Sequence, residues 1–193
     1  IIVLGAYCTV IILLFGHALV PGADELIWGD DIHRYHYFFR QFFLRSVEKG
    51  VVPFWNPFQF SGYPSLANPQ SATLFYPMSW IFFFLPLNLA FTWYIALHML
   101  LAMGSMYWFM RRILDRPSAW VSGLVYGLSG YMVAQIWAGH VDIIASASYL
   151  PLVVGLLWRL ADGGSFRYIA LAALAVALQL FAGYQTVALF TWE

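Results

Sequence analysis

The sequence predicts an all-α protein, a polytopic transmembrane helical bundle with a long first extracytoplasmic loop. Of its 193 residues 62% are hydrophobic and only 9% are charged, whereas soluble domains carry about 25% charged residues. Five apolar segments approach or exceed about twenty residues, the length that crosses a bilayer as a helix. The one long interruption is polar and rich in turn residues, and it contains a segment with the periodicity of an amphipathic helix at the membrane interface.

The charge balance and the cysteine content exclude two classes of interpretation. Nine basic and nine acidic residues give a formal net charge of +0, so no polybasic surface indicates a nucleic-acid partner. The single cysteine, Cys8, cannot form an intramolecular disulfide. The chain begins and ends within apolar runs, and we therefore expect residues 1–193 to be the N-terminal part of one longer integral membrane domain.

Each apolar segment is expected to form one span, and the first resembles a transmembrane helix more than a signal peptide because it lacks a basic flank. The second begins with a piece, 77–85, that ends at Pro86 and is too short to cross alone. The fourth contains Pro151, which neighbouring helices can accommodate. The expected spans are 1–20, 77–110, 118–138, 143–158 and 168–192.

The orientation of the bundle follows from its short connections, because Lys and Arg accumulate on the cytoplasmic side. Arginines follow the second and the fourth span: Arg111, Arg112, Arg116, Arg159 and Arg167. The connection after the third span contains neither Lys nor Arg. We therefore expect this connection and the loop 21–76 to lie outside a cytoplasmic membrane.

The first part of the loop has the pattern of an amphipathic helix. Residues recurring near a 3.6-residue period predict its apolar face: Ile32, Tyr35, Phe38, Phe39, Phe42, Phe43 and Val47. Polar residues fill the other face: His33, Arg34, Tyr37, Arg40, Gln41 and Arg45. Asp30 or Asp31 fits the start of this helix and Gly50 fits its end.

The second part of the loop is expected to be an ordered coil. Four prolines and a glycine forbid a regular helix or a central strand: Pro53, Pro57, Pro64, Pro69 and Gly62. Aromatic side chains should hold this coil on the bundle: Phe54, Trp55, Phe58, Phe60 and Tyr63.

Asp30 and Asp31 are the first candidates for chemistry. An ionised carboxylate can deprotonate or orient a hydroxyl group, or hold a divalent cation against a phosphate leaving group. The alternative is that one of them only caps the helix, since Asp is a preferred N-cap residue. A cap requires one carboxylate, however, and the sequence supplies two.

Other polar residues of the outward segments are secondary candidates. His33 and His36, three residues apart, could form a divalent cation site with Asp30, although no further ligand cluster supports it. Arg34 and Arg40 are suited to bidentate contacts with a phosphate, or simply face anionic head groups.

Three polar residues at the ends of later spans could converge on the first loop. His140 and Asp142 lie in the connection after the third span, and Gln185 lies near the end of the fifth. Polar residues within a membrane usually have a function. These three lie at span ends, however, where contact with water explains them equally well. Gln135, Gln179 and His98 are expected to be interhelical hydrogen-bond partners.

The segment GDDIHRYHYFFRQFFLRSVEKGVVPFWNPFQFSGYPSLANPQSATLFYP resembles the YfhO-like bacterial membrane proteins, a family of the GT-C class of polytopic glycosyltransferases. The resemblance rests on an acidic residue, an aromatic helix with an Arg, and the motifs WNP, GYP, NPQSA and YP. These fall here on Asp31, Arg40, Gly50, Pro53, Trp55 to Pro57, Gly62 to Pro64, Asn68 to Ala72, and Tyr76 with Pro77. The segments 111–140, 149–151 and 182–185 are also similar to that family.

The resemblance implies a GT-C-like glycosyltransferase in the bacterial inner membrane that uses a polyprenyl-phosphate sugar and inverts the anomeric carbon. Its acceptor would be a cell-envelope glycan or lipid, and its catalytic carboxylate would be Asp31, with Asp30 one position away. The phosphate would lie near Arg34 or Arg40, and the sugar would stack on the segment of Trp55, Asn56 and Tyr63. Family members have more spans, so this chain alone should be inactive.

Two other classes of protein remain open at this point. A transporter or flippase would move a lipid-linked precursor, but transporters place binding groups near the bilayer midplane, whereas here they gather in outward loops. A non-catalytic structural protein would use the paired Asp residues as a cap and the WNP segment for packing.

Overall fold

The computed structural model describes residues 2–22, 24–68 and 75–192. Within these ranges the chain is all-α, because it contains helices and one isolated backbone bridge but no strand. Part of one predicted motif, Pro69 to Ala72, lies outside the described residues.

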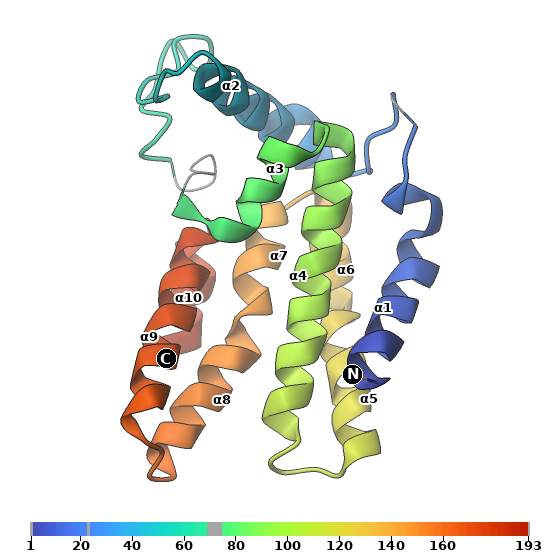
Figure 1. The fold of residues 1–193 in the computed structure, drawn as a ribbon. Coiled ribbons are helices and arrows are strands. Elements are labelled where there is room, and N and C mark those ends of the chain that lie inside the picture. The colour runs from blue at the N-terminus through green and yellow to red at the C-terminus, as the bar shows by residue number, and fades with distance from the viewer. Residues whose placement is uncertain (1, 23, 69–74, 193) are drawn as a thin grey trace.

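Long helices pack side by side and form the body of the molecule (Figure 1). The predicted spans 1–20 and 77–110 correspond to α1 (Ile2–Phe15) with the 3₁₀ turn η1 (Gly16–Leu19), and to η4 (Pro77–Trp80), α3 (Ile81–Phe84) and α4 (Leu87–Met110). The span 118–138 corresponds to α5 (Arg116–Gly127) and α6 (Gly130–Ala138), and 143–158 to α7 (Val141–Ser148) and α8 (Leu150–Ala161). The last region contains α9 (Phe166–Phe181) and α10 (Gln185–Trp192).

The prediction of one continuous helix over 168–192 is wrong. The chain reverses after α9, where Gly183 adopts φ +114, a conformation that favours glycine. The amide of Gln179 donates to Thr191 Oγ1 at 2.9 Å, so α10 folds back along α9. The third segment is also interrupted, because Ser129 caps α6 by accepting from the backbone N–H of Met132.

The first loop lies across one end of this bundle, at the end where α6 passes into α7 (Figure 1). It contains a single π-helical turn, η2 (Ile32–His36), followed by α2 (Tyr37–Glu48). Gly50, at φ +70, closes α2 as expected. Ile32, Phe39 and Phe43 are buried against the bundle, whereas Phe38 and Val47 are 49% and 38% exposed, so the predicted apolar face is only partly covered.

The coil after α2 is stabilised by its own backbone and aromatic contacts. Asn56 and Tyr63 form an antiparallel bridge with hydrogen bonds of 2.9 and 3.0 Å. The Tyr63 ring packs edge-on against Phe39. The loop returns to the bundle at Tyr76, whose hydroxyl lies 2.6 Å from His98 Nε2 on α4, so His98 does link two segments as predicted.

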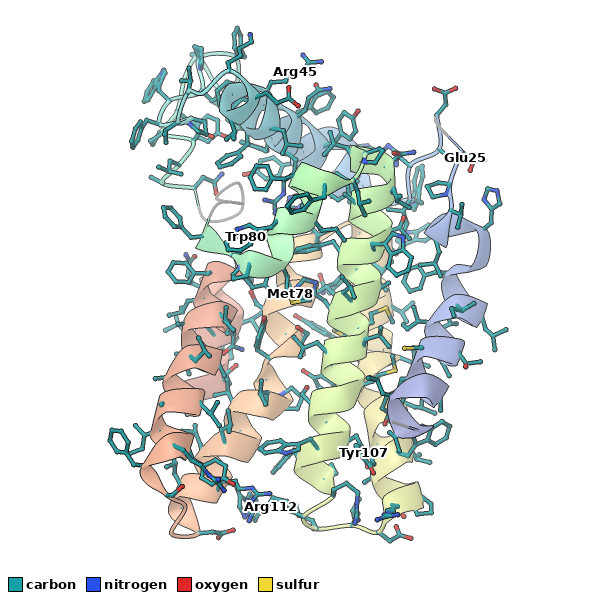
Figure 2. All side chains as sticks on the ribbon, in the orientation of Figure 1. Glu25, Arg45, Met78, Trp80, Tyr107 and Arg112 are labelled. Atoms are coloured by element: carbon teal, nitrogen blue, oxygen red, sulfur yellow. The ribbon has the colours of Figure 1, made fainter. Side chains whose placement is uncertain are left out.

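Charged residues gather at the two ends of the bundle. Figure 2 shows Glu25 and Arg45 at the end covered by α2, and Arg112 at the opposite end. Among the described residues, two helices are long and apolar enough to cross a membrane, α4 and the pair α7 and α8 taken together (Val141–Ala161). The connections α4–α5 and α8–α9, which contain or are flanked by arginines, lie opposite the first loop (Figure 1).

Candidate functional site

A cavity of about 380 Å³ lies where the start of the loop helix meets the α6–α7 junction. It brings together residues that are far apart in the sequence, and we call it the rim pocket. Its lining residues are Asp31, Tyr35, His36, His140, Asp142, Ile143 and Tyr184. The predicted convergence of His140 and Asp142 on the first loop is therefore observed.

The two neighbouring aspartates have different surroundings. Asp31 Oδ2 lies 3.2 Å from His140 Nε2, and the Asp31 side chain makes no helix-capping hydrogen bond. Asp30 is exposed and pairs with Arg34 one turn along the helix, with Nε and Oδ1 2.9 Å apart. Asp31 thus faces the rim pocket, whereas Asp30 pairs with a neighbour on its own helix.

His140 is held from its other side by Gln135. The imidazole Nδ1 lies 2.6 Å from Gln135 Oε1, and since a carbonyl oxygen only accepts, Nδ1 carries the hydrogen. This contact fixes the ring so that Nε2 faces the Asp31 carboxylate. Gln135 was expected to be an interhelical hydrogen-bond partner, and its side chain orients a residue of the rim pocket.

A second imidazole and carboxylate form the buried wall of the rim pocket. His36 and Asp142 are 3% and 4% exposed, and His36 Nε2 lies 3.7 Å from Asp142 Oδ1. Burial, with smaller effects of Arg40 and His140, lowers the pKa of His36 to about 3. His36 is therefore neutral near pH 7, so this contact is polar rather than an ion pair.

Two glycines set the distance between the loop helix and the bundle. A Cβ atom on Gly139 would lie 2.7 Å from the backbone nitrogen of Ile32 and 2.9 Å from that of Asp31. A Cβ atom on Gly29 would lie 2.8 Å from the Gly139 Cα. Gly139 also has φ +82, so its position requires glycine both for space and for conformation.

The two arginines that were predicted to bind phosphate differ in their exposure to solvent. Arg34 is exposed beside Asp30. Arg40 is 4% exposed and its guanidinium stacks on the Phe82 ring, with 4.8 Å to the ring centroid. Burial lowers the pKa of Arg40, while Tyr94 and Asp142 oppose that shift. The assignment of Arg40 to the polar face of the helix is wrong, because its side chain packs inward against Phe82.

The aromatic candidates lie at the other end of α2. Trp55 and Asn56 line a groove of about 650 Å³ between α2 and the following coil, which we call the coil groove. Asn56 is itself buried, and its side chain accepts from the N–H of Phe58 and donates to Gln59. About ten residues of helix, or about 15 Å, separate the centres of the two cavities.

Two further candidates lie outside the rim pocket. Tyr63 packs against Phe39 and Phe60, and Gln185 is exposed at the start of α10. The neighbour of Gln185, Tyr184, is the residue that lines the rim pocket. The AGYQ segment therefore reaches the site through a residue that sequence reasoning did not select.

The histidine spacing does not produce a metal site. His33 is exposed and packs near the Trp28 ring, whereas His36 is buried. Within the described ranges, no three His, Cys, Asp or Glu side chains are arranged to hold one metal ion.

Comparisons with known proteins identified no relative of this chain. No protein-family model matches the chain, and neither curated proteins nor solved structures gave a match.

Proposed function

We propose that this chain is part of a multi-pass membrane glycosyltransferase of the YfhO-like, GT-C type, with the rim pocket as its active site. The single observation that carries the proposal is the Asp31 carboxylate, which faces a cavity and an oriented imidazole rather than local backbone amides. A carboxylate in such surroundings is suited to accept a proton from an acceptor hydroxyl.

The distribution of charge and apolar surface supports a membrane location. Between the two charged ends, the helices carry large apolar side chains on their outer surface, such as Leu13, Val125 and Phe190, which are 77%, 65% and 68% exposed. Soluble proteins rarely expose so many large apolar groups. The 24 residues of α4 span about 36 Å, enough to cross the hydrocarbon core.

The arginine pattern supports an outward rim pocket. At the end opposite the first loop, Arg111 and Arg112 follow α4, Arg116 begins α5, and Arg159 and Arg167 flank the α8–α9 connection. Short basic segments of this kind favour the cytoplasmic side. The rim pocket would then face the extracytoplasmic side of a bacterial inner membrane, where lipid-linked sugars meet acceptors of the cell envelope.

The reaction would be a single inverting displacement. The acceptor oxygen forms a bond to the anomeric carbon while the bond from that carbon to the polyprenyl phosphate breaks, and the phosphate leaves with the electron pair. Asp31 takes the hydroxyl proton. Since Nδ1 donates to Gln135, His140 Nε2 can donate to Asp31 only when both ring nitrogens carry hydrogen, and in this imidazolium form it keeps the Asp31 carboxylate in place. Arg34, an exposed cation on the helix turn that follows Asp31, would contact the phosphate, whereas buried Arg40 would act only through its charge.

Substitution of Asp31 tests this assignment. Asp31→Asn in the full-length protein keeps the side-chain size but removes the base, and we expect glycosyl transfer to fall at least about a hundredfold. The assay follows a radiolabelled polyprenyl-phosphate sugar into product, with membrane abundance measured in parallel.

The neighbouring residue supplies the matched control. Asp30→Asn removes the same charge one position away, where the carboxylate pairs with Arg34, and transfer should fall less than about fivefold. Equal activity of Asp31→Asn and the unsubstituted protein would remove Asp31 from the mechanism. Absence of transfer by the unsubstituted protein with every donor would favour a transporter or a structural protein.

A further inference from the structure

The coil groove is lined by two basic side chains that have no role in the proposed reaction. Arg45 and Lys49 line it from successive turns of α2. Neither forms an ion pair with any residue that the structure describes. Glu48 lies between them in sequence and is absent from the lining of the coil groove, although Arg45 and Glu48 both line a second cavity against the 82–87 segment. The coil groove is therefore positively charged and selects an anion.

The remaining lining is apolar and aromatic. Phe38 and Phe42 form its α2 side, and Trp55 and Phe58 its coil side. Trp55 and Phe58 are 57% and 83% exposed. Aromatic rings beside basic side chains are typical of segments at the boundary between lipid head groups and acyl chains.

We infer that the coil groove binds an anionic phospholipid of the surrounding bilayer. Its phosphate would contact Arg45 and Lys49, and an acyl chain would lie on Phe42 and Phe58. The inference rests on the membrane location in the proposed function but not on the proposed chemistry. An acidic peptide would use the two cations equally well but would leave the apolar coil side without a matching partner.

Photolabelling of the full-length protein tests this site. The protein is reconstituted into nanodiscs that contain phosphatidylglycerol or phosphatidylcholine with a photoactivatable acyl chain, and labelled peptides are mapped by mass spectrometry. We expect peptides covering 38–59 to be labelled about tenfold more by phosphatidylglycerol. Added inorganic phosphate should leave this preference unchanged, because it lacks the acyl chain.

Two pairs of substitutions separate a specific site from general attraction to anionic lipid. Arg45→Gln with Lys49→Gln should abolish the preference. Arg116→Gln with Arg167→Gln removes the same charge from exposed positions at the opposite end and should leave the preference intact. The preference itself is the readout, so it does not depend on activity.

Three results would overturn the inference. These are equal labelling by both lipids, a preference that survives the Arg45 and Lys49 substitutions, and a preference that inorganic phosphate suppresses. Labelling of peptides from α1 and α9 by both lipids reports membrane insertion independently. Labelling of α1 without labelling of the coil groove would therefore contradict the lipid site but not the membrane location. The transfer assay tests the proposed function separately.

Discussion

The two ends of the loop helix differ although they belong to one continuous segment. Its start, at Asp31 and His36, packs on the α6–α7 junction and faces carboxylates and imidazoles. Its end, at Arg45 and Lys49, packs on the coil that follows it and faces aromatic rings. The partner element, more than the helix itself, therefore decides which chemistry each end can support.

The largest effect is expected from a substitution that breaks the contact between the start of the loop helix and the bundle. Gly139→Ala would place a Cβ atom against the backbone at Asp31 and Ile32 and strain a residue at φ +82. We expect it to lower the free energy of unfolding by about 3 kcal/mol and to abolish transfer. Thermal unfolding of the purified full-length protein measures the first effect.

A second glycine serves as a control that distinguishes the steric clash of an added Cβ atom from the strain of a positive φ. Gly163 has φ +80, but a Cβ atom there would meet no other atom within 4 Å. Gly163→Ala should therefore cost about 1 kcal/mol and preserve transfer. Equal losses of stability for the two variants would contradict the close approach of the loop helix and the bundle.

The next effect concerns the buried imidazole of the first end. The pKa of His36 is about 3 in the folded protein and 6.5 when unperturbed, so between these values the unfolded chain binds a proton that the folded chain does not. Stability should thus fall as the pH is lowered, by about 2 kcal/mol between pH 6.5 and 5. The melting temperature measured at several pH values checks this.

Two histidines of the same segment allow the effect to be assigned. His36→Gln should reduce the fall in melting temperature between pH 7 and 5, whereas His33→Gln, at an exposed position, should leave it unchanged. A fall in His36→Gln as large as in the unsubstituted protein would show that another group causes it.

The smallest effect concerns the second end. Asn56→Ala removes the hydrogen bonds to Phe58 and Gln59, and we expect a local loss of about 1 kcal/mol. Hydrogen exchange followed by mass spectrometry should become several-fold faster in peptides covering 51–63 and remain unchanged in 29–40. Faster exchange in both would show that the two ends are coupled.

Much of the architecture could be predicted because it follows from local patterns. Apolar length located the long helices, and the 3.6-residue period located the helix that carries Asp31. Gly50 ends the loop helix as predicted, whereas the helix start at Ser129 was not predicted. The reversal after Phe181 was missed because the sequence on both sides is equally apolar, so hydropathy contains no sign of a change in direction.

The candidate site could be predicted only in part. Asp31 was selected as one of two neighbouring carboxylates and from the family resemblance, and His140 and Asp142 from their places at a span end. All three line the rim pocket. Tyr184 and Gln135 were not selected for the site, and His36 was selected only as a metal ligand, since their roles depend on which face a helix turns to its neighbour. Arg40 was placed on the wrong face for the same reason, and its burial is set by tertiary contacts with Phe82.

The single π-helical turn has a consequence for how this segment tolerates change. In a helix with i→i+5 bonding, residues five apart lie on the same face, and Asp31 and His36, which both line the rim pocket, have this spacing. In an α-helix the same two side chains would point about 140° apart. Insertion or deletion of one residue between Asp31 and His36 would thus move one of the two side chains out of the rim pocket. Such length changes are therefore more informative in this segment than substitutions.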